Sequence, residues 1–180
     1  MPVVRAYLAD HAVAFRDKPA VVDDRPGAPV TVWSFAELNR QANRLAHVLL
    51  GLGVTPGEKV VWCGPNSPGV LRAVHALPKI GAVMVPLNYR FTADEATYVV
   101  GNSDAVVVYA DAEQAGLLAR IRDAVPRVRH FIVFDGPAGP GMHSSEAVLA
   151  RASDAEPEVD IPAGTPSSML YTSGTTGRPK

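Results

Sequence analysis

The stretch KVVWCGPNSPGVLRAVHALPKIGAVMVPL, residues 59–87, decides the fold. It begins and ends with apolar runs rich in β-branched residues, Lys59–Cys63 and Ala82–Leu87, which do not alternate cleanly with polar residues. A strand that is covered on both faces has this pattern. Between the two runs, Ser67 and Pro68 open a segment with the apolar spacing of a helix. Strand, helix and strand in this order predict a right-handed unit with two parallel strands.

The same rhythm continues after residue 87. Two further apolar runs, Ala105–Tyr109 and Phe131–Phe134, predict two more buried strands. Thr92 and Glu95 have the spacing of a capping box, which predicts a helix from there to about residue 100. Another helix is expected to begin at Asp111. The sequence therefore predicts an α/β fold with a mostly parallel sheet and helices on both faces.

Residues 3–58 are expected to precede this sheet with two helices and a hairpin. An apolar stripe predicts the first helix over residues 3–17, and residues 20–22 and 30–33 predict a hairpin that turns around Pro26-Gly27. Ser34 and Glu37 resemble a second capping box, at the start of a long helix with one apolar face. On this helix we expect four polar side chains to face water: Asn39, Arg40, Asn43 and Arg44.

One residue in this scheme conflicts with helical structure. Pro78 falls inside the helix that ends near Gly81, where proline removes a backbone donor and clashes with the preceding turn. We therefore expect this helix to kink or break at Pro78, and no functional reason for it is evident from the sequence.

Composition excludes several classes of function. The chain has 180 residues, of which 47% are hydrophobic, and its formal net charge of −1 argues against a nucleic-acid partner. No apolar run approaches the roughly 20 residues of a membrane span. Cys63 is the only cysteine, so that no disulfide can form within the chain. These features predict a cytoplasmic protein with a core large enough for one domain.

The sequence offers no convincing metal centre or thiol nucleophile. Its histidines are scattered and lack partners at metal-ligand spacing: His11, His47, His75, His130 and His143. We interpret them as surface or core side chains. Cys63 ends an apolar run and is expected to be a small buried hydrophobe, because no activating base can be identified for it.

The last part of the chain changes character. Residues 135–166 form a connector that is rich in proline and glycine, with a short helix expected over residues 144–151. Residues 168–171 are expected to form a strand that leads into the loop 171–180, Tyr-Thr-Ser-Gly-Thr-Thr-Gly-Arg-Pro-Lys. Glycines leave backbone N–H groups accessible, four hydroxyls add donors, and Lys180 adds a mobile positive charge. These groups suit a polyphosphate anion.

This loop closely resembles the phosphate loop of the adenylate-forming enzymes, which include acyl-CoA synthetases, aryl-CoA ligases and peptide-synthetase adenylation domains. All ten positions fit that family's pattern. The resemblance extends back to about residue 20, through Thr31–Leu38, Gly53–Val60 and Lys79–Arg90. Residues 85–90, Val-Pro-Leu-Asn-Tyr-Arg, resemble acyl-CoA synthetases more than peptide-synthetase domains. The resemblance implies that residues 1–180 are the amino-terminal portion of an AMP-binding domain, without the carboxyl-terminal domain.

The resemblance also implies an activity and roles for individual residues. Members of the family join a small carboxylic acid to ATP, releasing pyrophosphate, and acyl-CoA synthetases then transfer the acyl group to CoA. By this likeness, the phosphate-binding residues would be Thr172, Ser173, Gly174, Thr175, Thr176, Gly177 and Lys180. Lys180 would act catalytically by neutralising the departing pyrophosphate, and Thr172 would be a candidate Mg²⁺ ligand. The chain alone is expected to be inactive and to self-associate.

Three alternatives remain at this stage. The chain could be a non-catalytic phosphate-binding or interaction module that keeps the loop without the reaction. It could belong to an adenylation enzyme whose acceptor is not CoA. It could also be a different phosphate-binding α/β protein, if the matches in the early helix and in residues 86–90 are coincidence. A Ser/Thr/Gly-rich tail without function is disfavoured, because it would rarely match ten specified positions.

Overall fold

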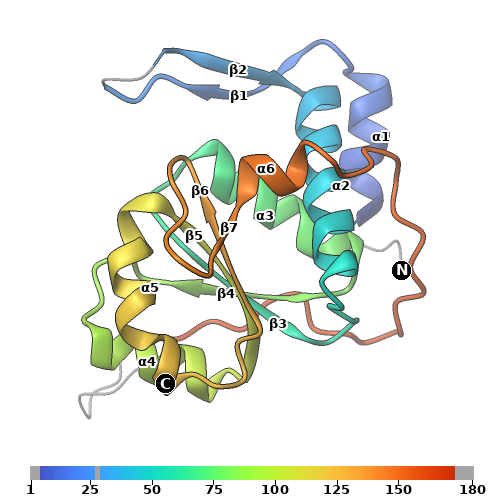
Figure 1. Ribbon diagram of the computed structural model, residues 1–180. Coiled ribbons are helices and arrows are strands. Elements are labelled where there is room, and N and C mark those ends of the chain that lie inside the picture. Colours follow the sequence, from blue (N-terminus) through green and yellow to red (C-terminus); the bar gives the residue numbers. More distant parts are fainter. Residues whose placement is uncertain (1–4, 27–28, 173–180) are drawn as a thin grey trace.

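The computed structural model describes residues 5–26 and 29–172, and the sequence folds there into a sheet covered by helices on both faces (Figure 1). The strands of the described chain are β1 (Pro19–Asp23) and β2 (Thr31–Ser34), which form a separate two-stranded sheet, and β3 (Lys59–Cys63), β4 (Val83–Leu87), β5 (Ala105–Asp111), β6 (His130–Phe134) and β7 (His143–Ser144). Its helices are α1 (Arg5–Ala14), α2 (Phe35–Gly51), α3 (Pro68–Lys79), α4 (Ala93–Asn102), α5 (Ala115–Ile121) and α6 (Ser145–Leu149), with 3₁₀ turns η1 (Ala112–Gln114) and η2 (Arg122–Ala124).

The main sheet has the order β4-β3-β5-β6-β7, and all of its pairings are parallel. The four predicted apolar runs are its first four strands, which confirms the predicted fold class. The chain leaves β3 towards β4 on one side and returns to β5 on the other. The order of the strands therefore reverses between β3 and β5.

Two separate apolar clusters lie on the two faces of the sheet, as the unbroken apolar runs predict. One cluster packs α1, α2 and α3 against side chains such as Val60, Tyr109 and Ile132. The other packs α4 and α5 against Val61, Val108 and Val133. Neighbouring residues of one strand thus enter different cores, because successive side chains of a strand point to opposite faces.

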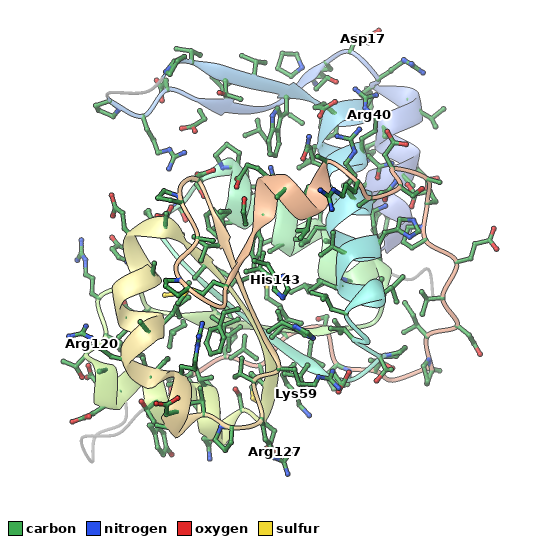
Figure 2. The ribbon with its side chains drawn as sticks, in the orientation of Figure 1. Asp17, Arg40, Lys59, Arg120, Arg127 and His143 are labelled. Carbon is green, nitrogen blue, oxygen red and sulfur yellow. The ribbon has the colours of Figure 1, made fainter. Side chains whose placement is uncertain are left out.

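The hairpin predicted near the amino terminus is present as β1 and β2, which pair antiparallel with Val22 opposite Val32. It lies above the carboxyl ends of the parallel strands (Figure 1). Figure 2 shows Lys59, at the start of β3, and Arg127, shortly before β6, at the end of the molecule away from the hairpin. Of the predicted turn, Gly27 lies outside the described residues.

The two predicted capping boxes differ in the structure. At α4 the box is complete, because Thr92 accepts from the Glu95 N–H and Glu95 accepts from the Thr92 N–H. At α2 only half of it forms: Ser34 accepts from the Glu37 N–H, at 3.2 Å. The Glu37 carboxylate instead accepts from Arg40 and Gln41, so the reciprocal bond was predicted wrongly.

The sequence pattern predicted that the polar face of α2 is exposed to water, but part of this face is buried. Asn43 is only 1% exposed, because residues 154–156 of the connector cross over it. The helix does not break at Pro78: α3 continues through it to Lys79, and Gly81, two residues later, has a φ of 67°, a left-handed conformation that is typical after a helix end. Among the described residues no helix is long and apolar enough to cross a membrane.

Candidate functional site

Most of the predicted phosphate-binding residues lie outside the part of the chain that the structure describes. These are Ser173, Gly174, Thr175, Thr176, Gly177 and Lys180, and only Thr172 is described. What the structure does describe is the segment that leads to them. Residues 152–171, here called the strap, run from α6 across α2 and α3 to the outer edge of β4. The contacts of the strap fix the position at which the backbone reaches Thr172.

The predicted strand over residues 168–171 is wrong in extent. The strap makes one parallel bridge, between Ser168 and Met84, with Met84 donating to the Ser167 carbonyl and Met169 donating to the Met84 carbonyl. The next residue of β4 that faces the strap is Pro86, which has no N–H to donate. The ladder therefore cannot continue, and the bridge stays isolated.

Tyr171, the residue before Thr172, is held by a side chain from α4. Its hydroxyl donates to Asn102 Oδ1 at 2.7 Å, and its ring packs with Met169 against the apolar cluster under α4 and α5. Partial burial raises the pKa of the Tyr171 hydroxyl, which therefore remains a donor at neutral pH. The root of the loop is thus fixed by both a polar and an apolar contact.

A cavity of about 410 Å³ opens beside Tyr171, at the carboxyl ends of β3 and β4. Aromatic rings line much of it, from Trp62, Tyr89, Phe91 and Tyr171, and Asn66 and Asn88 add polar groups. Ligands of open α/β sheets bind outside the carboxyl ends of the strands. The segment that carries the predicted phosphate loop therefore reaches the sheet at an edge where ligands of such folds bind.

The beginning of the strap is fastened by a buried cation. Lys79 is only 1% exposed, and its Nζ lies 2.7 Å from Glu156 Oε2 and 2.9 Å from Asn39 Oδ1. Asn39 and Asn43 also donate to Glu156 Oε1. Although partial burial acts to raise it, the pKa of Glu156 lies below its ordinary value because of the hydrogen bonds from Lys79 and Asn39. The carboxylate therefore stays charged against Lys79.

Cys63 is confirmed as a buried small hydrophobe. It is fully buried, and burial, with a smaller effect of Asp111, raises its pKa to about 12. A thiol with that pKa supplies almost no thiolate at neutral pH.

The interpretation of the histidines as scattered needs one correction, because His130 Nδ1 and His143 Nε2 lie 3.3 Å apart on neighbouring strands. Within residues 5–26 and 29–172, no group of three or more histidine, cysteine or acidic side chains could hold a metal ion.

Sequence reasoning missed the residues that position the loop. Asn102 stands 69 residues before Tyr171, and Lys79 stands 77 before Glu156. Nothing local marks these residues as partners. The only signal was Lys79 itself, a charged side chain at the end of a largely apolar helical segment.

The sequence model of a family described as AMP-binding enzyme matches residues 8–180. The chain is 34% identical to a feruloyl-CoA synthase of Amycolatopsis sp. over 179 residues, which are 99% of this chain and 31% of that protein. It is 33% identical to the crotonobetaine/carnitine–CoA ligase of Escherichia coli O1:K1 over 182 residues, 98% and 35% of the two chains. It spans about a third of the length of these curated relatives.

A solved structure supports the same grouping. The inhibitor-bound N-terminal domain of FACL13 from Mycobacterium tuberculosis superimposes with a TM-score of 0.87 at 30% identity, over 100% of this chain and 43% of that one. The parallel sheet and its helices are therefore those of that domain.

Proposed function

The chain belongs to the AMP-binding enzyme family, and from this premise we propose that it is the amino-terminal part of an ATP-dependent acyl-CoA ligase. In the proposed reaction a carboxylate oxygen attacks the α-phosphorus of ATP and pyrophosphate leaves. The sulfur of CoA then displaces AMP from the acyl-adenylate. The single observation that carries the proposal is the ten-residue loop sequence 171–180, which follows a strap anchored at the carboxyl edge of β4.

The loop residues have distinct tasks in this proposal. Backbone N–H groups and hydroxyls of residues 172–177 hold the β- and γ-phosphates while the bond to the α-phosphorus breaks. Lys180 neutralises charge on the leaving pyrophosphate, which is electrostatic stabilisation by a positioned group. Mg²⁺ would neutralise part of the negative charge on the phosphates. The Thr172 hydroxyl has an oxygen atom, and Mg²⁺ is bound by oxygen ligands.

Support for the proposal also comes from what surrounds the end of the strap. The aromatic cavity beside Tyr171 has a size within the range of small-molecule sites. The relatives named above carry CoA in their names, which favours CoA over another acceptor. The carboxylic acid is not defined by these residues, and fatty acids are among the candidates. We further propose a cytoplasmic location, and self-association through exposed valines of the hairpin, Val22, Val30 and Val32.

Carboxylate-dependent ATP–pyrophosphate exchange in the full-length enzyme tests the role of Lys180. We expect Lys180→Ala to slow exchange by about 10²-fold, the usual cost of removing one group that stabilises developing charge. Arg178→Ala is the matched control, because the resemblance gives position 178 no fixed residue, and its exchange rate should be unchanged. An undiminished rate in Lys180→Ala would remove this residue from the mechanism.

A second experiment separates the proposal from a non-catalytic nucleotide-binding module. The 180-residue chain should catalyse no exchange and should bind ATP with a Kd of about 1 mM or weaker, because solvated phosphate contacts each contribute only about 1 kcal/mol. Calorimetry should show similar affinity for ATP and inorganic triphosphate, and weaker binding in added salt. Micromolar, adenine-selective binding would favour the complete binding module instead.

A further inference from the structure

A second cavity, of about 690 Å³, lies between the β1–β2 hairpin and the carboxyl ends of β3, β5 and β6. It shares only Pro65 with the cavity beside Tyr171. Pro65 follows β3, and Asp111 and Glu113 follow β5 or end it, so the cavity opens where the strand order reverses. Open α/β sheets bind ligands at this point of the topology. Tyr171 and Thr172, the two residues of the predicted phosphate loop that the structure describes, do not line this cavity.

A buried arginine from α3 forms part of the cavity wall. Arg72 is only 8% exposed, and its Nη1 donates to Tyr109 Oη at 3.0 Å and lies 3.5 Å from Ser145 Oγ. The Trp33 ring covers the guanidinium, with 5.3 Å between Cζ and the ring centroid. Two hydrogen bonds and one aromatic ring therefore fix the orientation of this cation before any ligand arrives.

The charge of Arg72 is not balanced within residues 5–26 and 29–172. No carboxylate of the described chain forms an ion pair with it, and its Nε has no hydrogen-bond partner there. An unpaired buried charge is costly, and a guanidinium binds carboxylates with two parallel hydrogen bonds. A carboxylate that entered the cavity would supply the missing counter-charge, and because Nε is itself buried, Nε is not the atom that such a carboxylate would contact.

The cavity also carries carboxylates that a simple anion would meet. Asp23 and Asp135 are both paired with Arg25, at 2.8 and 3.2 Å. Asp111 is almost fully buried and Glu113 is exposed, and neither forms an ion pair among the described residues. Burial, together with the charges of Asp135 and Glu113, raises the pKa of Asp111. These two acids would repel a ligand that carries negative charge alone and would attract an ammonium group.

We propose that this cavity binds a small zwitterion of the amino-carboxylate class. Its carboxylate pairs with Arg72 beside Trp33, and its ammonium group is taken by Asp111 and Glu113. This arrangement selects for ligands that carry both charges. A ligand with only a carboxylate would pair with Arg72 but would be repelled by the two acids, and a ligand with only an ammonium group would leave Arg72 without a counter-charge. The residues assigned to this site, Arg72, Asp111 and Glu113, are not among those assigned to the proposed acyl-CoA ligase activity, so each proposal can fail without the other.

Calorimetry on the 180-residue chain tests the proposal. The probes are glycine, β-alanine and 4-aminobutanoate, which carry both charges, against propionate and propylamine, which carry one each. At least one zwitterion should bind at least about tenfold more tightly than either single-charge probe, a difference that calorimetry resolves. Equal binding of propionate, or no saturable binding of any zwitterion up to about 10 mM, overturns the proposal.

Variants locate the binding. Arg72→Met should abolish zwitterion binding, and Arg44→Met is the matched control, because Arg44 pairs with Asp154 outside the cavity. Because Arg72 is buried, circular dichroism must show that its variant folds. Glu113→Gln changes an exposed side chain, keeps the fold and should weaken zwitterion binding by about tenfold while leaving propionate unaffected. Zwitterion binding that is unchanged in Glu113→Gln counts against the site, whether or not Arg72→Met folds.

Discussion

The hydroxyl of Tyr171 donates to Oδ1 of Asn102 at 2.7 Å, so the last residue of α4 holds the first residue of the predicted phosphate loop. Asn102 is exposed and Tyr171 is half-buried, so water competes for the bond. Its net contribution to stability should therefore lie near the lower end of the usual range, about 0.5 kcal/mol. Its effect on the local order of the strap should be larger than its effect on global stability, because the strap meets the edge of the sheet at an isolated bridge.

The first prediction concerns this pair. Tyr171→Phe and Asn102→Ala should each lower the free energy of unfolding by about 0.5–1 kcal/mol, and the double variant should cost little more than either single one. Hydrogen exchange of the Met169 amide should rise in all three variants. Tyr89→Phe is the control, since no hydrogen bond of the Tyr89 hydroxyl exists in the described structure. Fully additive costs would show that the two side chains do not act together.

The parallel sheet could be predicted from the sequence because its cause is local. A strand such as β5, covered on both faces, must be apolar throughout, and the buried pattern of Val107, Val108 and Tyr109 is visible without knowledge of the partners. The helix that begins at Thr92 could be predicted for the same reason, because both halves of its cap lie within four residues.

What could not be predicted depends on distant residues. Asn43 lies on the polar face of α2 by its spacing, but its Nδ2 donates to the Asp154 carbonyl, 111 residues away. The strand expected near Ser168 is limited to one bridge by Pro86, which belongs to another strand. The half-formed cap at Ser34 reflects competition, since Arg40 and Gln41 attract the Glu37 carboxylate more strongly than the Ser34 N–H does.

The second prediction compares the two helix starts. Thr92→Ala and Ser34→Ala should each cost about 0.5–2 kcal/mol, because each removes the acceptor for an N–H of the first helical turn. Glu95→Gln should destabilise the protein more than Glu37→Gln does at the same helix position, because only Glu95 accepts from its cap residue. Urea denaturation measures all four variants. Equal effects of the two glutamine substitutions would show that the reciprocal bond at Thr92 adds nothing.

The third prediction uses two helical glycines. A Cβ on Gly69, in α3, would lie 2.3 Å from a ring carbon of Phe134, whereas a Cβ on Gly101, in α4, would meet no atom within 4 Å. Gly69→Ala should therefore destabilise the protein by at least about 1–3 kcal/mol, the cost of overpacking. Gly101→Ala should stabilise it by about 0.4–1 kcal/mol, because alanine restricts the unfolded chain. Thermal unfolding of the two variants shows directly whether each substitution raises or lowers the stability. A Gly69→Ala variant as stable as the parent would mean that the Phe134 ring can move aside.

The last prediction concerns the pH dependence of stability through Glu156. Its pKa is lowered in the folded protein, so the folded state binds this proton less readily than the unfolded chain does. Such a group contributes stability above its unfolded pKa, about 4.3, and that contribution is lost as the pH falls through the lower folded pKa. Glu156→Gln should remove this part of the acid dependence and should leave the buried Lys79 without its charged partner at every pH.

We therefore expect the free energies of unfolding of the parent and of Glu156→Gln to differ most near pH 7 and to converge only when the pH falls below the lowered pKa of Glu156 in the folded protein, because the parent carboxyl is then protonated as well. Glu158→Gln is the matched control, an exposed carboxylate on the same strap that forms no ion pair among the described residues. Its curve should follow the parent at every pH. Denaturant unfolding at several pH values measures the three curves. A constant gap between parent and Glu156→Gln would mean that Lys79 gains nothing from the charge of Glu156 and that hydrogen bonding alone fastens the strap.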